Sequence, residues 1–165
     1  ALAHTVADNG GVCFVPALTG LGAPHWNAHA RGLICGLTRG TTAGHIARAA
    51  LEGIAFSQWD ILQAMQKDCR KKLKTLKVDG GASANHFLMQ FQADLLNCRI
   101  VRPEIVETTA LGAALLAGLA VGYWKGLEEI KQSVKINHTF TSQMKKNERA
   151  QLISQWQKAV GKALL

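Results

Sequence analysis

Two adjacent glycines separate a short apolar run from a helical pattern in the stretch 78–85, Val-Asp-Gly-Gly-Ala-Ser-Ala-Asn. Gly80 and Gly81 let the backbone turn sharply and leave no Cβ in the way of a ligand. A helix that starts there directs its free N–H groups and its positive dipole end toward the same place. Asn85 adds an amide that can donate and accept, as the edge of an adenine requires. The stretch therefore predicts a site for an anionic or nucleotide ligand.

Spacing alone leaves a simpler interpretation open, because a lone pair of glycines is a weak signal. The stretch fits neither the P-loop nor the glycine pattern of dinucleotide-binding folds. It could be a plain strand-to-helix turn in which Asn85 belongs to the cap region. Asp79 precedes the glycines, and we interpret it as an acceptor of hydrogen bonds from the turn amides and not as a catalytic base.

Two carboxylates on a long predicted helix are the next candidates for chemistry. Glu52 and Asp60 are eight residues apart and so lie roughly on one helix face. Two carboxylates without a third ligand are a weak case for a metal, and we predict that Glu52 instead pairs with Arg48 at i−4. The histidines and cysteines show no metal-ligand spacing, so we predict no metal site and no disulfide framework.

Hydrophobic periodicity predicts alternating strands and helices around these residues. Short strands are expected at 12–16, 33–37, 73–78 and 99–102. Helices are expected from Thr41 or Thr42 to about 67, over 83–96, from Thr108 or Thr109 to about 121, and over 147–165. Residues 122–143 are expected to be irregular, with one helical turn near 127. Strands and helices that alternate over short links predict an α/β fold, and we expect Trp156 of the last helix to pack on the same chain.

The composition is that of a globular chain with an uneven positive charge. Of its 165 residues 48% are hydrophobic, and the net charge is +8, with much of the basic excess in residues 67–77. No aromatic residue lies within that run, so we interpret it as a solvated helix end and loop, and a nucleic-acid partner is not expected. The best apolar run, 110–121, is too short to span a membrane. We see no signal-peptide pattern, and we expect the four cysteines to be small core residues or free thiols in a reducing compartment and the location to be cytoplasmic.

Several stretches carry a resemblance to one family. Residues 31–37 and 45–52, Arg-Gly-Leu-Ile-Cys-Gly-Leu and His-Ile-Ala-Arg-Ala-Ala-Leu-Glu, are similar to a signature of the FGGY carbohydrate kinases. Within that family, residues 15–26, 79–94 and 107–114 resemble the glycerol kinases in particular. The resemblance covers nearly the whole chain, least well at 67–77 and beyond 126.

The resemblance implies a lobe of the actin-like ATPase, ribonuclease-H-like fold. Kinases of this kind bind ATP between two lobes, and glycerol kinases transfer its γ-phosphate to a terminal hydroxyl of glycerol to give glycerol 3-phosphate. The chain would be the C-terminal, ATP-binding part. By the same resemblance Gly81 should bring its backbone beside the ADP, Asn85 should meet the adenine, and Gly80 and Ala82 should line the turn.

The resemblance also implies which parts lie elsewhere. The glycerol pocket, the carboxylate that acts as general base, a Thr-Gly phosphate turn and the opening β-meander of the lobe are expected in sequence before this chain, and Mg would be held mainly there. We therefore expect no catalytic residue here, an incomplete lobe, and no kinase activity from these residues alone. His25 stands where the family usually has Tyr, and Asn27-Ala28 where it has Asp-Pro, but both lie outside the nucleotide turn.

We predict a single domain over 1–165, with a core at about 12–121 and a C-terminal helical extension at about 122–165. The full-length enzyme would act on glycerol and ATP as a homo-oligomer, without a membrane. Two alternatives stay open. One is a kinase for another polyol or sugar of the same family, and the other is a non-catalytic nucleotide-binding or interaction module.

Overall fold

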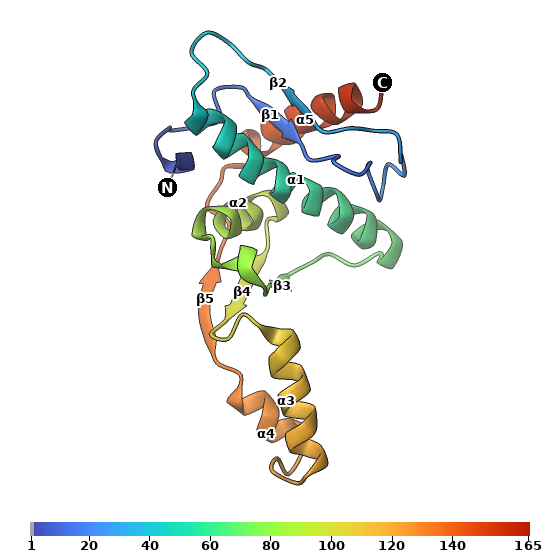
Figure 1. Cartoon of the computed structure of the whole chain (residues 1–165), viewed down its shortest axis with the longest axis vertical. Helices are drawn as coiled ribbons and strands as arrows, with labels where there is room; N and C mark the ends of the chain where they lie inside the picture. Colours follow the sequence, from blue (N-terminus) through green and yellow to red (C-terminus); the bar gives the residue numbers. More distant parts are fainter. Residues whose placement is uncertain (1) are drawn as a thin grey trace. The chain divides into compact units, whose positions relative to one another are not determined.

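The computed structural model describes residues 2–165 and shows a mixed α/β chain (Figure 1). This confirms the predicted class, and most of the predicted elements are present. In chain order the elements are η1 (Leu2–His4), β1 (Cys13–Val15), β2 (Leu33–Cys35), α1 (Ala43–Cys69), β3 (Thr75–Lys77), η2 (Gly81–Ala84), α2 (His86–Leu96), β4 (Arg99–Pro103), α3 (Thr108–Ala120), α4 (Leu127–Ser133), β5 (Ile136–Phe140) and α5 (Lys146–Ala163).

The backbone contacts divide the chain into two compact units, each described by itself. The first unit comprises Ala1–Lys72, Asp94–Leu96 and Gln143–Leu165, and the second comprises Leu73–Ala93 and Asn97–Ser142. A division by contacts does not set domain boundaries, so the single domain over 1–165 stays a prediction. No helix in residues 2–165 is long and apolar enough to cross a membrane.

The first unit is built around the long helix α1. Thr42 is its N-cap, as predicted, and the backbone N–H of Thr42 donates to Nδ1 of His45 at 3.0 Å. β1 and β2 pair antiparallel, with Cys13 opposite Cys35, and both α1 and α5 pack against β1 (Figure 1). α1 can approach β1 closely because Gly53 lacks a side chain: a Cβ there would lie 2.2 Å from the carbonyl oxygen of Phe14.

Trp156 fixes α5 within the first unit. Its side chain is buried and stacks on Phe56, with 5.1 Å between the ring centroids and 7° between the planes. Its indole N–H donates to Oδ2 of Asp60 at 2.8 Å, and Nε2 of His25 lies 3.4 Å from the same oxygen. The prediction that Trp156 packs on its own chain is therefore confirmed. Asp60 serves as the hydrogen-bond acceptor of this packed tryptophan.

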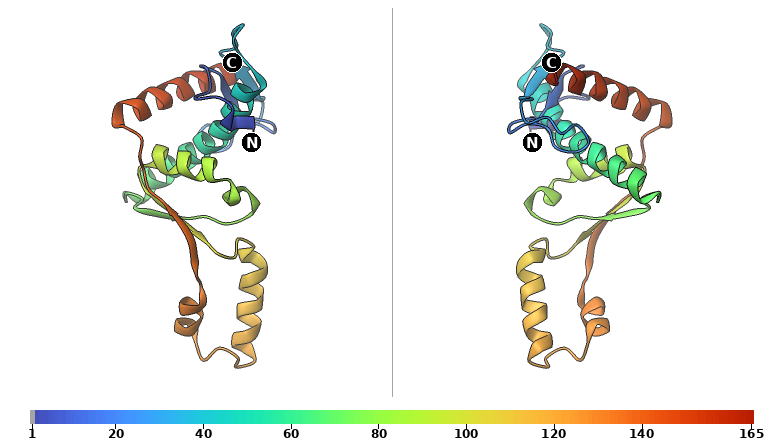
Figure 2. Two further views of the ribbon diagram at one scale, coloured as in Figure 1. Left: turned by 90° about the vertical axis from the view of Figure 1, so that its left-hand side faces the viewer. Right: turned by 90° about the vertical axis from the view of Figure 1, so that its right-hand side faces the viewer.

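The second unit is a three-stranded sheet in the order β3-β4-β5. β3 and β4 are parallel and are joined through η2 and α2, which makes a strand–helix–strand unit. β4 and β5 are antiparallel, with Ile100 opposite Phe140, and both side chains are buried. β4 and β5 run side by side, and α3 and α4 belong to the segment that joins them (Figure 2).

The segment 122–143 and two helix starts differ from the sequence-based predictions. The helical turn expected near 127 is present as the seven-residue helix α4, but the expectation that the rest of 122–143 is irregular was wrong, because it holds the strand β5. In β5 only Phe140 is buried, so the strand lacks the alternation that would reveal it, and its pairing with β4 defines it. α2 begins at His86 after the turn η2, not at 83, and the N-cap of α3 is Glu107, not a threonine.

Candidate functional site

The predicted turn lies where β3 gives way to η2 and α2. Gly80 has a φ of 76°, in the left-handed region that favours glycine. The carbonyl oxygen of Gly80 accepts from the backbone N–H of Ser83 at 3.1 Å and from its hydroxyl at 2.7 Å. Ser83 is buried, with 1% of its surface exposed. The buried hydroxyl of Ser83 therefore stabilises the turn that follows the double glycine.

The outer side of the same turn is open. A Cβ built on Gly80 or on Gly81 meets no atom within 4 Å. Gly81 and Ala82 are exposed, and Gly80 and Asn85 are partly exposed. The N–H groups of Gly81 and Ala82 are the first of η2 and so have no acceptor within that turn. The four predicted site residues thus share one accessible stretch, with bare backbone beside it for a ligand.

Asn85 caps α2 in addition to any contact with a ligand. Its Oδ1 accepts from the backbone N–H of Leu88 at 3.1 Å, and its carbonyl oxygen accepts from that of Met89 at 3.1 Å. Asn85 is thus the N-cap of α2, as the simpler interpretation of the stretch has it, and not a residue of the first helical turn, where the predicted helix start at 83 would place it. A carbonyl oxygen has two lone pairs and the amide nitrogen two hydrogens, so capping leaves donor and acceptor capacity for an adenine edge.

A second link ties the turn to the segment before α3. The carboxylate of Asp79 accepts a hydrogen bond from the hydroxyl of Thr108, and the backbone N–H of Gly80 donates to the carbonyl oxygen of Val106 at 2.8 Å. We expected the turn amides to donate to Asp79, and this expectation was wrong. The donor is instead the hydroxyl of Thr108, which lies 29 residues later in the sequence. Two of the quoted sequence stretches, 79–94 and 107–114, therefore meet at the turn.

One residue at the turn was missed by sequence reasoning. Nη1 of Arg102, from β4, donates to the carbonyl oxygen of Ser83 at 2.7 Å, and its side chain is 6% exposed. The signal available was an arginine that directly follows the apolar pair Ile100-Val101 in a short predicted strand. We interpreted that arginine only as the last residue of a strand.

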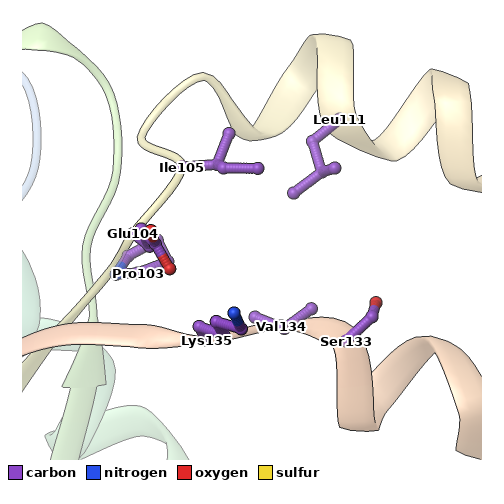
Figure 3. A pocket seen from close by; sticks show the side chains of 7 residues that line it. All are labelled: Pro103, Glu104, Ile105, Leu111, Ser133, Val134 and Lys135. Atoms are coloured by element: carbon purple, nitrogen blue, oxygen red, sulfur yellow. The ribbon is translucent and has the colours of Figure 1, made fainter.

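The second unit has a pocket beside the turn and another beside the segment 103–105. The larger, of about 640 Å³, includes Val78, Asp79 and Thr108 in its lining and therefore adjoins the turn. The smaller, of about 280 Å³, lies where Ile105 and Leu111 face Val134 (Figure 3). None of the four predicted site residues lines either pocket, but Asp79, which lines the larger one, directly precedes Gly80.

The carboxylates of the first unit form a structural network. Glu52 is buried, and Oε1 accepts from Nε of Arg48 at 2.9 Å, while Oε2 accepts from the amide of Asn9 at 2.7 Å. The predicted pairing with Arg48 is confirmed. Burial raises the pKa of Glu52, and the hydrogen bonds from Arg48 and Asn9 oppose that effect. Within residues 2–165 no group of three or more metal-binding side chains comes together.

The turn, with its serine, its N-capping asparagine and its link to α3, coincides with a family match. Residues 1–121 match the C-terminal domain of the FGGY family of carbohydrate kinases. The chain therefore belongs to this family.

Glycerol kinases are among the curated proteins to which this chain is similar. The chain is 57% identical over 162 residues to the glycerol kinase of Parabacteroides distasonis. The aligned region covers 98% of this chain and 32% of that protein. It is 59% identical over 164 residues to the glycerol kinase of Borreliella burgdorferi (strain ZS7). That aligned region covers 99% of this chain and 33% of the Borreliella protein. The chain thus spans about a third of the length of these relatives.

Solved structures show the same fold. A crystal structure of Plasmodium falciparum glycerol kinase with ADP matches at 39% identity with a TM-score of 0.90, over 99% of this chain and 33% of that one. A ligand-bound xylulose kinase from Lactobacillus acidophilus matches at 30% identity with a TM-score of 0.77, over 97% and 32%. The predicted actin-like, ribonuclease-H-like ATPase fold is confirmed by these likenesses to FGGY kinases.

Proposed function

We propose that this chain is the nucleotide-binding part of a glycerol kinase, an enzyme that transfers the γ-phosphate of ATP to a terminal hydroxyl of glycerol. The observation that carries the proposal is the turn at Gly80–Asn85, because its outer side is open at both glycines. Among solved structures the chain is 39% identical to a glycerol kinase and 30% identical to a xylulose kinase, and its curated relatives at 57–59% are glycerol kinases, which favours glycerol over another sugar or polyol.

The turn residues would each contribute one kind of contact to a bound nucleotide. Gly81 would bring its backbone N–H beside the ADP, and the amide of Asn85 would meet the adenine edge. Gly80 and Ala82 would line the same stretch. Phosphoryl transfer depends on positioning and on neutralising charge at the γ-phosphate, and no catalytic residue of that kind is assigned to this chain. A magnesium ion would supply the charge neutralisation, held mainly by residues outside these 165.

The first experiment is a titration of ADP into the chain, followed by calorimetry. We expect saturable binding that is weakened about tenfold or more by Asn85→Ser, because the serine oxygen can still cap α2 but cannot make a bidentate contact with adenine. Asn147→Ser, at an exposed asparagine of α5, is the matched control. Equal affinity for Asn85→Ser and wild type, at unchanged helicity, would remove Asn85 from the site.

A second experiment tests the reaction. A longer polypeptide that contains this chain should phosphorylate glycerol with MgATP, whereas the 165 residues alone should not. A polypeptide that binds ADP but phosphorylates another polyol or sugar would support the kinase of different specificity. Binding without any transfer would support the non-catalytic module. Self-association of the longer polypeptide, tested by light scattering, stays a prediction.

A further inference from the structure

The side chain of Arg102 is buried in the second unit, where its hydrogen-bond partners are a backbone carbonyl, an imidazole and a side-chain amide. Nη1 donates to the carbonyl oxygen of Ser83 at 2.7 Å, and Nη2 lies 3.0 Å from Nε2 of His86. Nε and Nη2 both donate to Oδ1 of Asn137, at 3.2 and 2.8 Å. Among residues 2–165 no carboxylate forms a salt bridge with this guanidinium. Burying a charge without an opposite charge is costly, so the arrangement calls for a reason.

The contacts of Arg102 flank the candidate nucleotide turn. Ser83 precedes Asn85 by two residues, and His86 follows it directly, so one guanidinium holds the chain on both sides of the asparagine. Ser83 in turn holds the carbonyl oxygen of Gly80 through its hydroxyl. A continuous set of hydrogen bonds therefore runs from β4 to both ends of the stretch Gly80–Asn85.

Arg102 is itself oriented by β5. Asn137 accepts two of its hydrogen bonds, and the guanidinium carbon lies 5.5 Å from the centroid of the Phe140 ring. The rings of His86, His138 and Phe140 pack on one another with centroids 4.3 to 5.4 Å apart. β5 lies beyond residue 121, where the family match ends.

We propose that Arg102 is a positioning residue for the nucleotide turn and that Asn137 positions Arg102. By fixing the carbonyl of Ser83 and the ring of His86, Arg102 sets the direction of the Asn85 amide and of the Gly81 N–H. β5 thereby contributes to nucleotide affinity without touching the nucleotide. The inference rests on the proposed nucleotide site, and it adds a strand outside the family match to the machinery of that site.

The test compares ADP affinity in the full 165-residue chain for Arg102→Lys, Arg102→Met, Asn137→Ala and Asn137→Asp. Arg99→Met is the matched control, since Arg99 lies on the same strand and is exposed.

We expect Arg102→Met to weaken ADP binding about tenfold or more, as for loss of a charge-assisted hydrogen bond. Arg102→Lys should keep more affinity than Arg102→Met, because the charge remains. It should not reach wild-type affinity, because an ammonium lacks the planar fork that meets three acceptors at once. Asn137→Ala should weaken binding severalfold, and Asn137→Asp, which keeps the acceptor, should restore it.

A readout without nucleotide separates this proposal from the proposed function. In Arg102→Lys and Asn137→Ala the NMR signals of the Gly81 N–H and of the Asn85 side-chain amide should shift in the free protein, while in Arg99→Met they should not. If the wild-type chain fails to bind ADP, the proposed function fails, and these shifts still decide the positioning. Unshifted signals together with wild-type ADP affinity in Arg102→Lys and Asn137→Ala would overturn the inference. Loss of affinity only in proportion to lost thermal stability would do the same.

Discussion

At the scale of single residues, the open side of the nucleotide turn gives a test that separates folding from binding. Gly81→Ala places a Cβ where no atom lies within 4 Å, and the φ of Gly81 is not in the left-handed region. The fold should therefore tolerate it, with a change in unfolding free energy of about 0.5 kcal/mol or less. The added methyl group would stand where the nucleotide is expected, so ADP affinity should fall.

The neighbouring position supplies the contrast. Gly80→Ala also meets no atom, but φ is 76° there, so it should cost roughly 1–2 kcal/mol of stability. Urea denaturation and calorimetry on both variants check the pair. Wild-type affinity in Gly81→Ala would show that the nucleotide does not approach this backbone.

Glu52 gives a prediction about pH. Burial raises its pKa above the ordinary value of 4.5, so the folded state binds the proton more tightly than the unfolded state. The stability from this group is fully present below about pH 4.5 and is lost as the pH rises through the folded value. Glu52→Gln does not titrate, so its stability relative to wild type should improve as the pH rises from about 4 to 7.

Urea midpoints over that pH range check this prediction, with the exposed Glu104→Gln as the control. A difference between Glu52→Gln and wild type that does not change with pH would contradict it. That result would mean that the hydrogen bonds from Arg48 and Asn9 fully offset the effect of burial on the pKa of Glu52.

At the scale of elements, the close approach of α1 and β1 predicts opposite results for the same substitution at two helical glycines. Gly53→Ala places a Cβ 2.2 Å from a backbone oxygen that cannot move aside easily, so it should destabilise the chain by about 1–3 kcal/mol or more. Gly161→Ala, in α5, meets nothing within 4 Å and should stabilise by up to about 1 kcal/mol through helix propensity. Thermal melts followed by circular dichroism measure both. The packing argument fails if Gly53→Ala melts at or above the wild-type temperature.

The elements also show how far the sequence predicts this fold. α1 and its cap at Thr42 follow from periodicity and capping, which are local. β5 does not, because four of its five residues are exposed and its pairing partner, β4, lies over thirty residues earlier. Asn85 could be identified as a site candidate, yet its capping bond depends on a helix that begins three residues later than expected. The role of Arg102 depends on three acceptors from separate places in the sequence, and no spacing rule brings these together.

At the scale of the whole molecule, α3 stands out because none of its thirteen residues is buried, although nearly all are apolar. Leu116 is 67% exposed and Val121, directly after the helix, 83%. Contiguous apolar surface of this kind marks a contact with other protein. In a protein as long as the glycerol kinases it resembles, further sequence would be available to cover this helix. In the 165-residue chain the surface stays open.

We therefore expect the 165-residue chain to bind a hydrophobic dye and to self-associate as its concentration rises. Leu116→Lys should reduce both effects, because it places a charge in the middle of the apolar surface of α3. Leu18→Lys is the control, since Leu18 is 73% exposed but lies in a loop of the first unit. Dye fluorescence and sedimentation velocity measure the two effects. A chain that stays monomeric without dye binding, or an equal response to both lysines, would mean that α3 is covered in solution by the chain itself.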